Sequence, residues 1–226
     1  MLMSTDSPDP WKTGTLVEHY NKLFPFDEKE IIEYLQPLKL GPEDTFVDFG
    51  CGNGAALAVA AKLCRRVIGI DIAAQQLEMA RKRLAESGNV RLLQIPFLEC
   101  RLEDEQLTRG SSRKALHHLT DPEKIEFFRM IGRRFVTGAR FVIEDAIFDF
   151  DRSELETHMP LVIADAELWY GDRWPQVQPD FLITIREEFA TGLNAWETAL
   201  RAGGFTLAER RRRTCFLSHL TAIKEG

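Results

Sequence analysis

A glycine-rich segment near residue 50 carries the residues best suited to chemistry. The run from Val47 to Gly54 reads VDFGCGNG, which places three glycines within five residues directly after an apolar stretch. Glycine is needed where the backbone φ is positive or where the backbone must approach a ligand closely. Such a turn brings backbone N–H groups and the start of a helix to the carboxyl end of a strand, where open α/β sheets bind ligands. The segment therefore predicts a ligand-binding turn.

An acidic residue follows at the position that a nucleoside ligand requires. Asp71 ends the next apolar run, 23 residues after Asp48. A carboxylate there can accept hydrogen bonds from both hydroxyls of a ribose. Glycines after a strand also form plain tight turns. Here, however, strand, turn, helix, strand and acid all fall in the order that a ligand site requires.

Two ligands compete for this turn. The pattern Gly50-x-Gly52-x-x-Ala55 matches the fingerprint of dinucleotide-binding proteins. Asp48, however, stands at the end of the strand, where its negative charge would repel a pyrophosphate. An acid at that point suits a ligand that carries an ammonium group.

The elements that must position these residues alternate between strand and helix. After an N-terminal helical stretch, strands are predicted over 45–49, 66–70, 90–95 and 140–147, and helices over 55–63, 73–87, 121–135 and 193–202. This alternation predicts an α/β fold whose mainly parallel sheet is covered on both faces. Two closing strands, 205–213 and 214–223, are expected to pair antiparallel at the sheet edge. Two regions break the pattern: 99–112 is polar, and 148–185 contains three prolines and is predicted to be irregular.

Five segments of this sequence resemble the class I S-adenosylmethionine-dependent methyltransferases, especially the small-molecule branch that includes ubiquinone- and menaquinone-type enzymes (methyltransferase types 11 and 25). They are FVDFGCGNG, VIGIDIAAQQLEMARKR, ALHHLTDPEKIEFFRMIGRRF, RFVIEDAIF and WETALRAGGFTLAERR. The resemblance implies a Rossmann-like, doubly wound sheet of seven strands with an antiparallel edge strand and an N-terminal helical lid. It also implies S-adenosyl-L-methionine as the cofactor.

The resemblance assigns cofactor contacts residue by residue. Gly50 and Gly52 would line the methionine part, and Asp48 would hold the loop or the ammonium group. Asp71 would bind the ribose hydroxyls, with Ile72 packing on the adenine. The other cofactor contacts implied are Cys51, Gly54, Phe97 at the adenine edge, Ser112 beside the methionine group and Tyr20 on the lid. Many relatives have an Asp where this chain has Ile95-Pro96-Phe97, and Glu99 is a substitute acid.

Candidate catalytic and substrate residues lie outside the glycine turn. His117 and His118 follow the polar fourth region, and a histidine can serve as a general base near neutral pH. Asp145 is expected at the end of the fifth strand, either against substrate or as a solvated loop acid. The segment after Phe148 supplies His158, Trp169 and Tyr170 as substrate candidates, with packing in a small separate core as the alternative.

Composition and the cysteine positions argue against several classes of function. The chain has 226 residues, with 29 Lys and Arg against 35 Asp and Glu, so its net charge is −6. This acidity argues against a nucleic-acid partner. No apolar stretch is long enough to span a membrane, and no secretory signal is present. The four scattered cysteines give no metal site. We expect one cytoplasmic domain with a disordered tail over 1–12, a helical cap over 13–40 and a substrate-side insertion over 149–185.

Three functions are therefore weighed for the chain. The first is methyl transfer from S-adenosylmethionine to a small-molecule acceptor by in-line displacement. The second is a non-catalytic module that keeps the cofactor pocket, which the polar fourth strand motivates. The third is a nicotinamide-dependent oxidoreductase, which the dinucleotide pattern motivates.

Overall fold

The computed structural model describes residue 21 and residues 27–226 of the chain. Tyr20, the tail over 1–12 and most of the cap over 13–40 lie outside the described residues. Of the expected cap, the structure gives α3 (Glu28–Leu35) and the 3₁₀ helix η1 (Gln36–Leu38).

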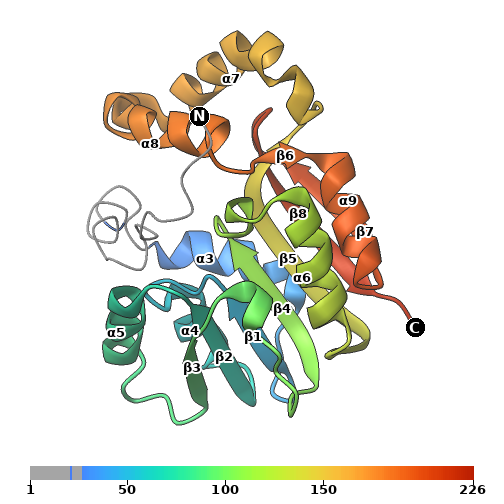
Figure 1. Cartoon of the computed structure of the whole chain (residues 1–226). Coiled ribbons are helices and arrows are strands. Elements are labelled where there is room, and N and C mark those ends of the chain that lie inside the picture. Colours follow the sequence, from blue (N-terminus) through green and yellow to red (C-terminus); the bar gives the residue numbers. More distant parts are fainter. Residues whose placement is uncertain (1–20, 22–26) are drawn as a thin grey trace.

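One sheet organises the molecule, and its strands run in the order β3-β2-β1-β4-β5-β8-β7 (Figure 1). They are β1 (Thr45–Phe49), β2 (Arg66–Asp71), β3 (Val90–Gln94), β4 (Leu107–Arg113), β5 (Phe135–Phe148), β7 (Phe205–Arg212) and β8 (Leu217–Lys224). An eighth strand, β6 (Thr191–Gly192), pairs with the end of β5. The first five strands are parallel, and β8 is antiparallel to both β5 and β7. The α/β prediction with an antiparallel closing pair is confirmed.

Helices cover both faces of this sheet (Figure 1). On one face α3, α4 (Ala55–Ala60) and α5 (Ala74–Arg83) pack on a core that includes Phe46 and Val67. On the other, α6 (Asp121–Gly132) and α9 (Leu193–Ala202) pack on a core that includes Phe49 and Phe141. Short 3₁₀ helices follow β3, at Phe97–Glu99 (η2), and β4, at Leu116–His118 (η3). Helix α6 begins at Asp121, where the sequence predicted it, with Thr120 as the N-cap in a capping box with Glu123, and it ends at Gly132, before the predicted residue 135.

The polar fourth strand forms completely in the centre of the sheet. Two of its polar side chains have partners on β1 or directly before it: Ser111 Oγ donates to Asp48 Oδ1 at 2.5 Å, and Thr108 Oγ1 donates to Asp44 Oδ1 at 2.7 Å. Gly110 leaves room for a neighbouring aromatic ring, since a Cβ there would lie 2.5 Å from Phe141 Cδ2. Buried polar groups cost little when they are hydrogen-bonded, so the strand does not need an apolar sequence.

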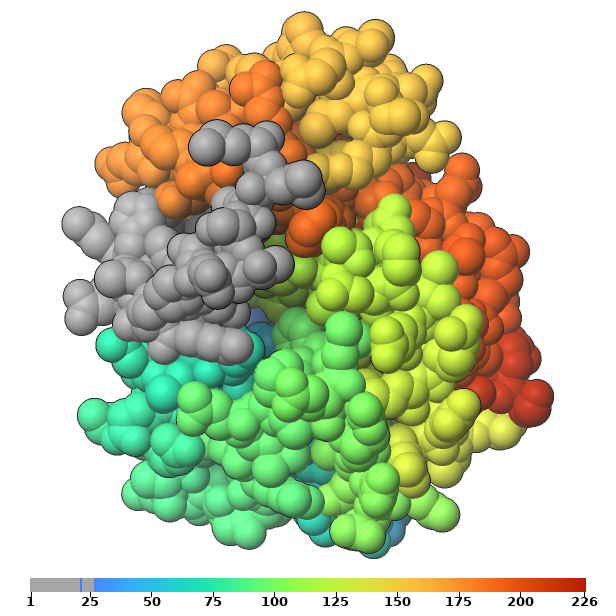
Figure 2. Space-filling model, viewed as in Figure 1, coloured from blue at the N-terminus to red at the C-terminus, as the bar shows by residue number. Residues whose placement is uncertain are grey.

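The prediction of an irregular 149–185 segment is wrong. Two helices form there, α7 (Leu155–Tyr170) and α8 (Trp174–Arg186). The 3₁₀ helix η4 (Arg152–Glu154) precedes α7, and η5 (Gly171–Arg173) precedes α8. Buried residues at helical spacing, Leu155, Met159, Val162 and Ala166, pack on the end of β5 and outweigh Pro160 inside α7. Figure 2 shows that α7 and α8, in yellow and orange, form one end of the molecule.

Candidate active site

A cavity of about 1040 Å³ opens at the carboxyl ends of β1, β2 and β4, between the glycine turn and the two helices of the insertion. Its walls come from segments far apart in the sequence: the turn after β1, the end of β2, the turn after β3, the turn after β4, and α7 with the chain after α8. Carboxyl ends of parallel strands are the usual place for ligands in such sheets. The topology therefore brings the predicted ligand turn and the predicted substrate segment to one site.

The glycine turn has the backbone conformation that its sequence predicts. Gly50, Gly52 and Gly54 have φ values of 78°, 52° and 78°. A Cβ on Gly50 would lie 2.3 Å from Ala115 Cβ, so only glycine lets the turn approach the loop after β4. Gly50, Cys51 and Gly52 line the cavity. Gly54 does not: it begins α4, and its missing Cβ makes room for Ala80 on α5, which corrects its assignment as a cofactor contact.

Asp71 is locked to this turn by hydrogen bonds. Its Oδ2 accepts from Gly52 N at 2.8 Å, and its Oδ1 accepts from Ala73 N at 2.9 Å. Each carboxylate oxygen keeps further acceptor capacity, and the residue lines the cavity beside Ile72. Burial raises the pKa of Asp71, and the backbone donors partly offset that rise. The arrangement presents a fixed carboxylate to a ligand hydroxyl.

Asp48 is a buried acid at the base of the same cavity. It is 3% exposed, and its only side-chain hydrogen bond to a described residue is the one from Ser111 Oγ. Burial raises the pKa of Asp48 to about 7; the Ser111 hydrogen bond lowers it and the charge of Asp71 raises it further. A positively charged ligand group nearby would favour the ionised form.

Apolar residues form the wall next to Asp71. Ile72, Ile95, Pro96 and Phe97 line the cavity, and Phe97 packs edge-on against Phe49 with ring centroids 6.5 Å apart. Glu99, the substitute acid, is not among the described residues that line the cavity. A flat heterocycle would therefore meet an apolar wall here rather than a carboxylate.

Ser112 does not reach the cavity, which corrects its assignment. It is fully buried, and its hydroxyl donates to the carbonyl of Phe49 at 2.9 Å. Strand β4 continues through Arg113, so the residues that meet the cavity are Arg113, Lys114 and Ala115. Burial lowers the pKa of Lys114 to about 8, with Arg113 adding to the decrease and Glu144 opposing it.

His117 and Asp145 form a buried pair behind the cavity wall. Asp145 is 0% exposed and lies inside β5, so the alternative prediction of a solvated loop acid is wrong. Its Oδ1 lies 2.5 Å from His117 Nδ1, and its Oδ2 accepts from the backbone N–H groups of Leu116 and His117. Burial lowers the pKa of His117, but the carboxylates of Asp145 and Glu188 outweigh it and raise that pKa to about 10. Neither His117 nor Asp145 is among the residues that line the cavity, and Asp145 lies inside β5, three residues before its end.

His118 and Glu188 occupy the cavity side of that pair. His118 Nδ1 lies 3.3 Å from Glu188 Oε1, and His117 Nε2 lies 3.3 Å from Glu188 Oε2. His118 and Glu188 both line the cavity. Sequence reasoning missed Glu188, since an acid next to Glu187 at the end of α8 gives no local signal of its role.

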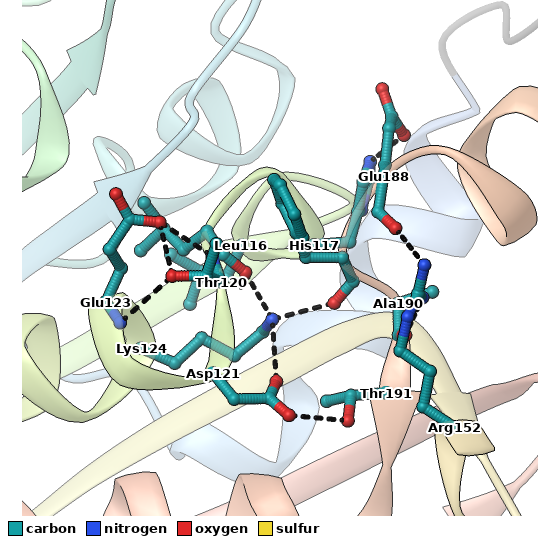
Figure 3. A network of polar contacts seen from close by, with 12 residues as sticks. Leu116, His117, Thr120, Asp121, Glu123, Lys124, Arg152, Glu188, Ala190 and Thr191 are labelled. Carbon is teal, nitrogen blue, oxygen red and sulfur yellow. Dashed lines mark hydrogen bonds and ion pairs between the residues drawn. The ribbon is translucent and has the colours of Figure 1, made fainter. Parts of the chain in front are cut away.

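A network of buried hydrogen bonds fixes Glu188 beside the histidines (Figure 3). Phe189 N donates to the carbonyl of His117 at 2.9 Å. Lys124, 0% exposed, donates to the carbonyls of Leu119 and Phe189. Arg152 donates to the carbonyls of Glu188 and Ala190. These contacts tie the chain after α8 to the loop after β4 and leave little freedom at the Glu188 backbone.

Two of the three substrate candidates predicted in the insertion line the cavity. Trp169 and Tyr170, at the end of α7, line the cavity. Burial raises the pKa of Tyr170 to about 12, so its hydroxyl stays protonated. His158 instead stacks on Phe150 with ring centroids 4.2 Å apart and is not a lining residue, because it lies nearly three turns before Trp169 on the helix.

The cavity lining is rich in acids. Acidic side chains outnumber the basic side chains of Arg113, Lys114 and Arg173 among the lining residues; the acids are Asp27, Glu30, Asp48, Asp71, Glu144, Glu187 and Glu188. This balance favours a cationic ligand over a pyrophosphate.

Comparison with known proteins agrees with this geometry. Residues 46–138 match a family described as a methyltransferase domain. The chain is 27% identical over 161 residues to an uncharacterised methyltransferase of Anoxybacillus flavithermus, covering 71% of this chain and 69% of the relative.

Solved structures share the fold at low sequence identity. A geranyl diphosphate C-methyltransferase from Streptomyces coelicolor is 14% identical with a TM-score of 0.65, covering 98% of this chain and 86% of that one. Magnesium protoporphyrin IX methyltransferase from Synechocystis is 12% identical with a TM-score of 0.65, covering 96% and 97%. A cyclopropane synthase from Mycobacterium tuberculosis is 20% identical with a TM-score of 0.63; the match covers 81% of this chain and only 62% of that one. Among the described residues, no helix is long and apolar enough to cross a membrane.

Proposed function

Because the chain carries a methyltransferase domain in a class I, Rossmann-like fold, we propose that it transfers the methyl group of S-adenosylmethionine to a small-molecule acceptor. One observation carries the proposal: the acid-lined cavity begins at a glycine turn that is hydrogen-bonded to Asp71 and backed by Asp48. The bound cofactor would supply an activated methyl group on a sulfonium.

The described residues fit the parts of that cofactor. Asp71 presents acceptor oxygens for the ribose hydroxyls, and Ile72 and Phe97 form the apolar wall that an adenine needs. Gly50 and Gly52 allow the backbone to lie close to the methionine part, and Asp48 supplies negative charge for its ammonium group. Tyr20 stays a prediction, as it lies outside the described residues.

The acceptor would enter from the side of the insertion. Trp169 and Tyr170 offer aromatic surface there, and His118 is the only one of the three predicted catalytic candidates that lines the cavity. Proximity of the reacting atoms can lower such a barrier by roughly 7–11 kcal/mol. The role of this chain is therefore chiefly to hold acceptor and cofactor in line and to exclude water.

The two alternative functions lose their support. The non-catalytic module was motivated by a fourth strand without strand character, yet β4 pairs in parallel with both β1 and β5, with one register shift between Leu107 and Arg109 on the β5 side. A nicotinamide dinucleotide would place its pyrophosphate next to Asp48 and Asp71, in a cavity lined by more acidic than basic side chains, where like charges repel.

Thermal melts with single ligands test the proposal. S-adenosylhomocysteine at about 100 times its dissociation constant should add roughly 2.7 kcal/mol of stability. Asp71→Ala should weaken that binding by about tenfold or more, equivalent to roughly 1.4 kcal/mol. Glu99→Ala is the matched control, since this acid lies outside the cavity lining. Stabilisation by NADH without stabilisation by S-adenosylhomocysteine would reverse the assignment of the cofactor.

A further inference from the structure

We propose that His117, His118 and Glu188 form a binding site for a divalent transition-metal ion at the acceptor end of the cavity. One ligand atom from each residue lies within 4.8 Å of the other two. Two imidazole nitrogens and one carboxylate oxygen suit zinc, cobalt or iron, whereas magnesium and calcium prefer oxygen alone.

Two of the three separations between the side chains are those of tetrahedral coordination. Ligands bound at ~2.0–2.1 Å on a tetrahedron lie about 3.3 Å apart, from the bond lengths usual for zinc. The Glu188 carboxylate lies 3.3 Å from His117 Nε2 through one oxygen and 3.3 Å from His118 Nδ1 through the other. The third separation, between the two histidine nitrogens, is within 4.8 Å, so the three groups are close enough to share one ion after side-chain adjustment.

Asp145 provides the outer support that metal-bound histidines usually have. Its carboxylate takes the Nδ1 side of His117, which turns Nε2 toward Glu188. A carboxylate on the far nitrogen fixes the tautomer and strengthens the ligand. Asp145 is itself held by the backbone N–H groups of Leu116 and Ala146.

The backbone that carries the ligands is tied together before any metal binds. His117 and Phe189 share a backbone hydrogen bond, buried Lys124 binds the carbonyl of Phe189, and Arg152 binds the carbonyls of Glu188 and Ala190 (Figure 3). A site built on fixed backbone loses little entropy when it takes up an ion.

Three protein ligands leave one position of a tetrahedron for another molecule. Because His118 and Glu188 line the cavity, that position faces the space proposed for the acceptor. This further step rests on the proposed function: the acceptor would bind the ion through an oxygen, as a hydroxyl, enol or carboxylate does. The metal site itself does not depend on methyl transfer.

The same side chains can also be held together as ion pairs alone, with a proton in place of the ion. Titration of the metal-free protein with Co²⁺ separates the two, because tetrahedral Co²⁺ absorbs visible light. We expect one equivalent to bind, with the same site taken by Zn²⁺ in competition. His118→Ala and Glu188→Gln should each weaken binding at least tenfold, and Asp145→Asn should weaken it 10- to 100-fold, as loss of such supporting groups usually does.

His158→Ala is the matched control, since His158 stacks on Phe150 away from the cluster. Circular dichroism and S-adenosylhomocysteine binding of each variant report whether it folds. Failure of wild-type protein to take up Co²⁺ or Zn²⁺, or equal binding by wild type and the folded Glu188→Gln variant, would overturn the metal site. If the wild-type protein does not bind S-adenosylhomocysteine, the proposed function is overturned, whereas the metal site is unaffected.

Discussion

Substitution of Asp48 by Asn should separate the stability of the ligand-free protein from its affinity for the cofactor. Asp48 is 3% exposed and accepts one hydrogen bond, from Ser111. The amide oxygen of Asn can accept the same hydrogen bond, so the variant keeps the contact and removes only the charge. The structure therefore offers a nearly isosteric test of a buried carboxylate.

The magnitude follows from the raised pKa of Asp48. Burial moves that pKa from 3.8 to about 7, which corresponds to about 4 kcal/mol. The folded state holds a proton that the unfolded chain releases, so this stability is present below pH 3.8 and is lost as the pH rises to about 7. Wild-type protein should thus lose about 4 kcal/mol relative to Asp48→Asn between pH 4 and pH 8.

Urea denaturation of both ligand-free proteins across this pH range measures the difference. Asp104→Asn, at an exposed position, should follow the wild type at every pH. At pH 8 the Asp48→Asn variant should be the more stable protein and yet bind S-adenosylhomocysteine about tenfold more weakly. A constant difference in the free energy of unfolding between wild type and Asp48→Asn, independent of pH, would refute the reasoning.

Three further predictions test the sheet, the buried network and the histidine pair. Gly110→Ala should lower the free energy of unfolding by about 1–3 kcal/mol in urea, since the new Cβ would lie 2.5 Å from Phe141 Cδ2; unchanged stability would contradict this packing. Lys124→Ala should cost about 2–4 kcal/mol in the same assay, as a buried carbonyl, Leu119, and a partly buried one, Phe189, lose their donor; a loss below about 1 kcal/mol would show that water replaces the ammonium. In metal-free protein, the NMR titration of His117 should have its midpoint near 10, and Asp145→Asn should lower it. That pairing stabilises the fold fully below about pH 6.5 and is lost as the pH rises through 10, so a midpoint near 6.5 would disprove the pairing.

The glycine turn and its acid were readable from the sequence because their chemistry is local. Gly50 and Gly52 need positive φ, and Asp71 needs only to end the strand that follows. Strand and helix periodicity around them was also sufficient to predict a mainly parallel sheet with helices on both faces. The register of that sheet then puts turn and acid in contact without further information.

The fourth strand and the insertion could not be predicted in this way. Ser111 and Thr108 are polar, and they become strand residues because Asp48 on β1 and Asp44 just before it accept their hydrogen bonds. The prolines of 149–185 suggested irregular chain, whereas packing against β5 stabilises α7 and α8. In both cases a contact distant in sequence outweighs the local preference.

The sequence by itself determined the fold class and the cofactor end of the site, since each rests on spacing within one strand, turn or helix. Only the tertiary structure decided the other end. In the tertiary structure Asp145 lies behind His117, and Glu188 lies beside the two histidines. Ser112 and His158 are not among the residues that line the cavity. These positions depend on how far β4 and β5 extend and on where the chain returns after α8, and both are set by packing between segments remote in the chain.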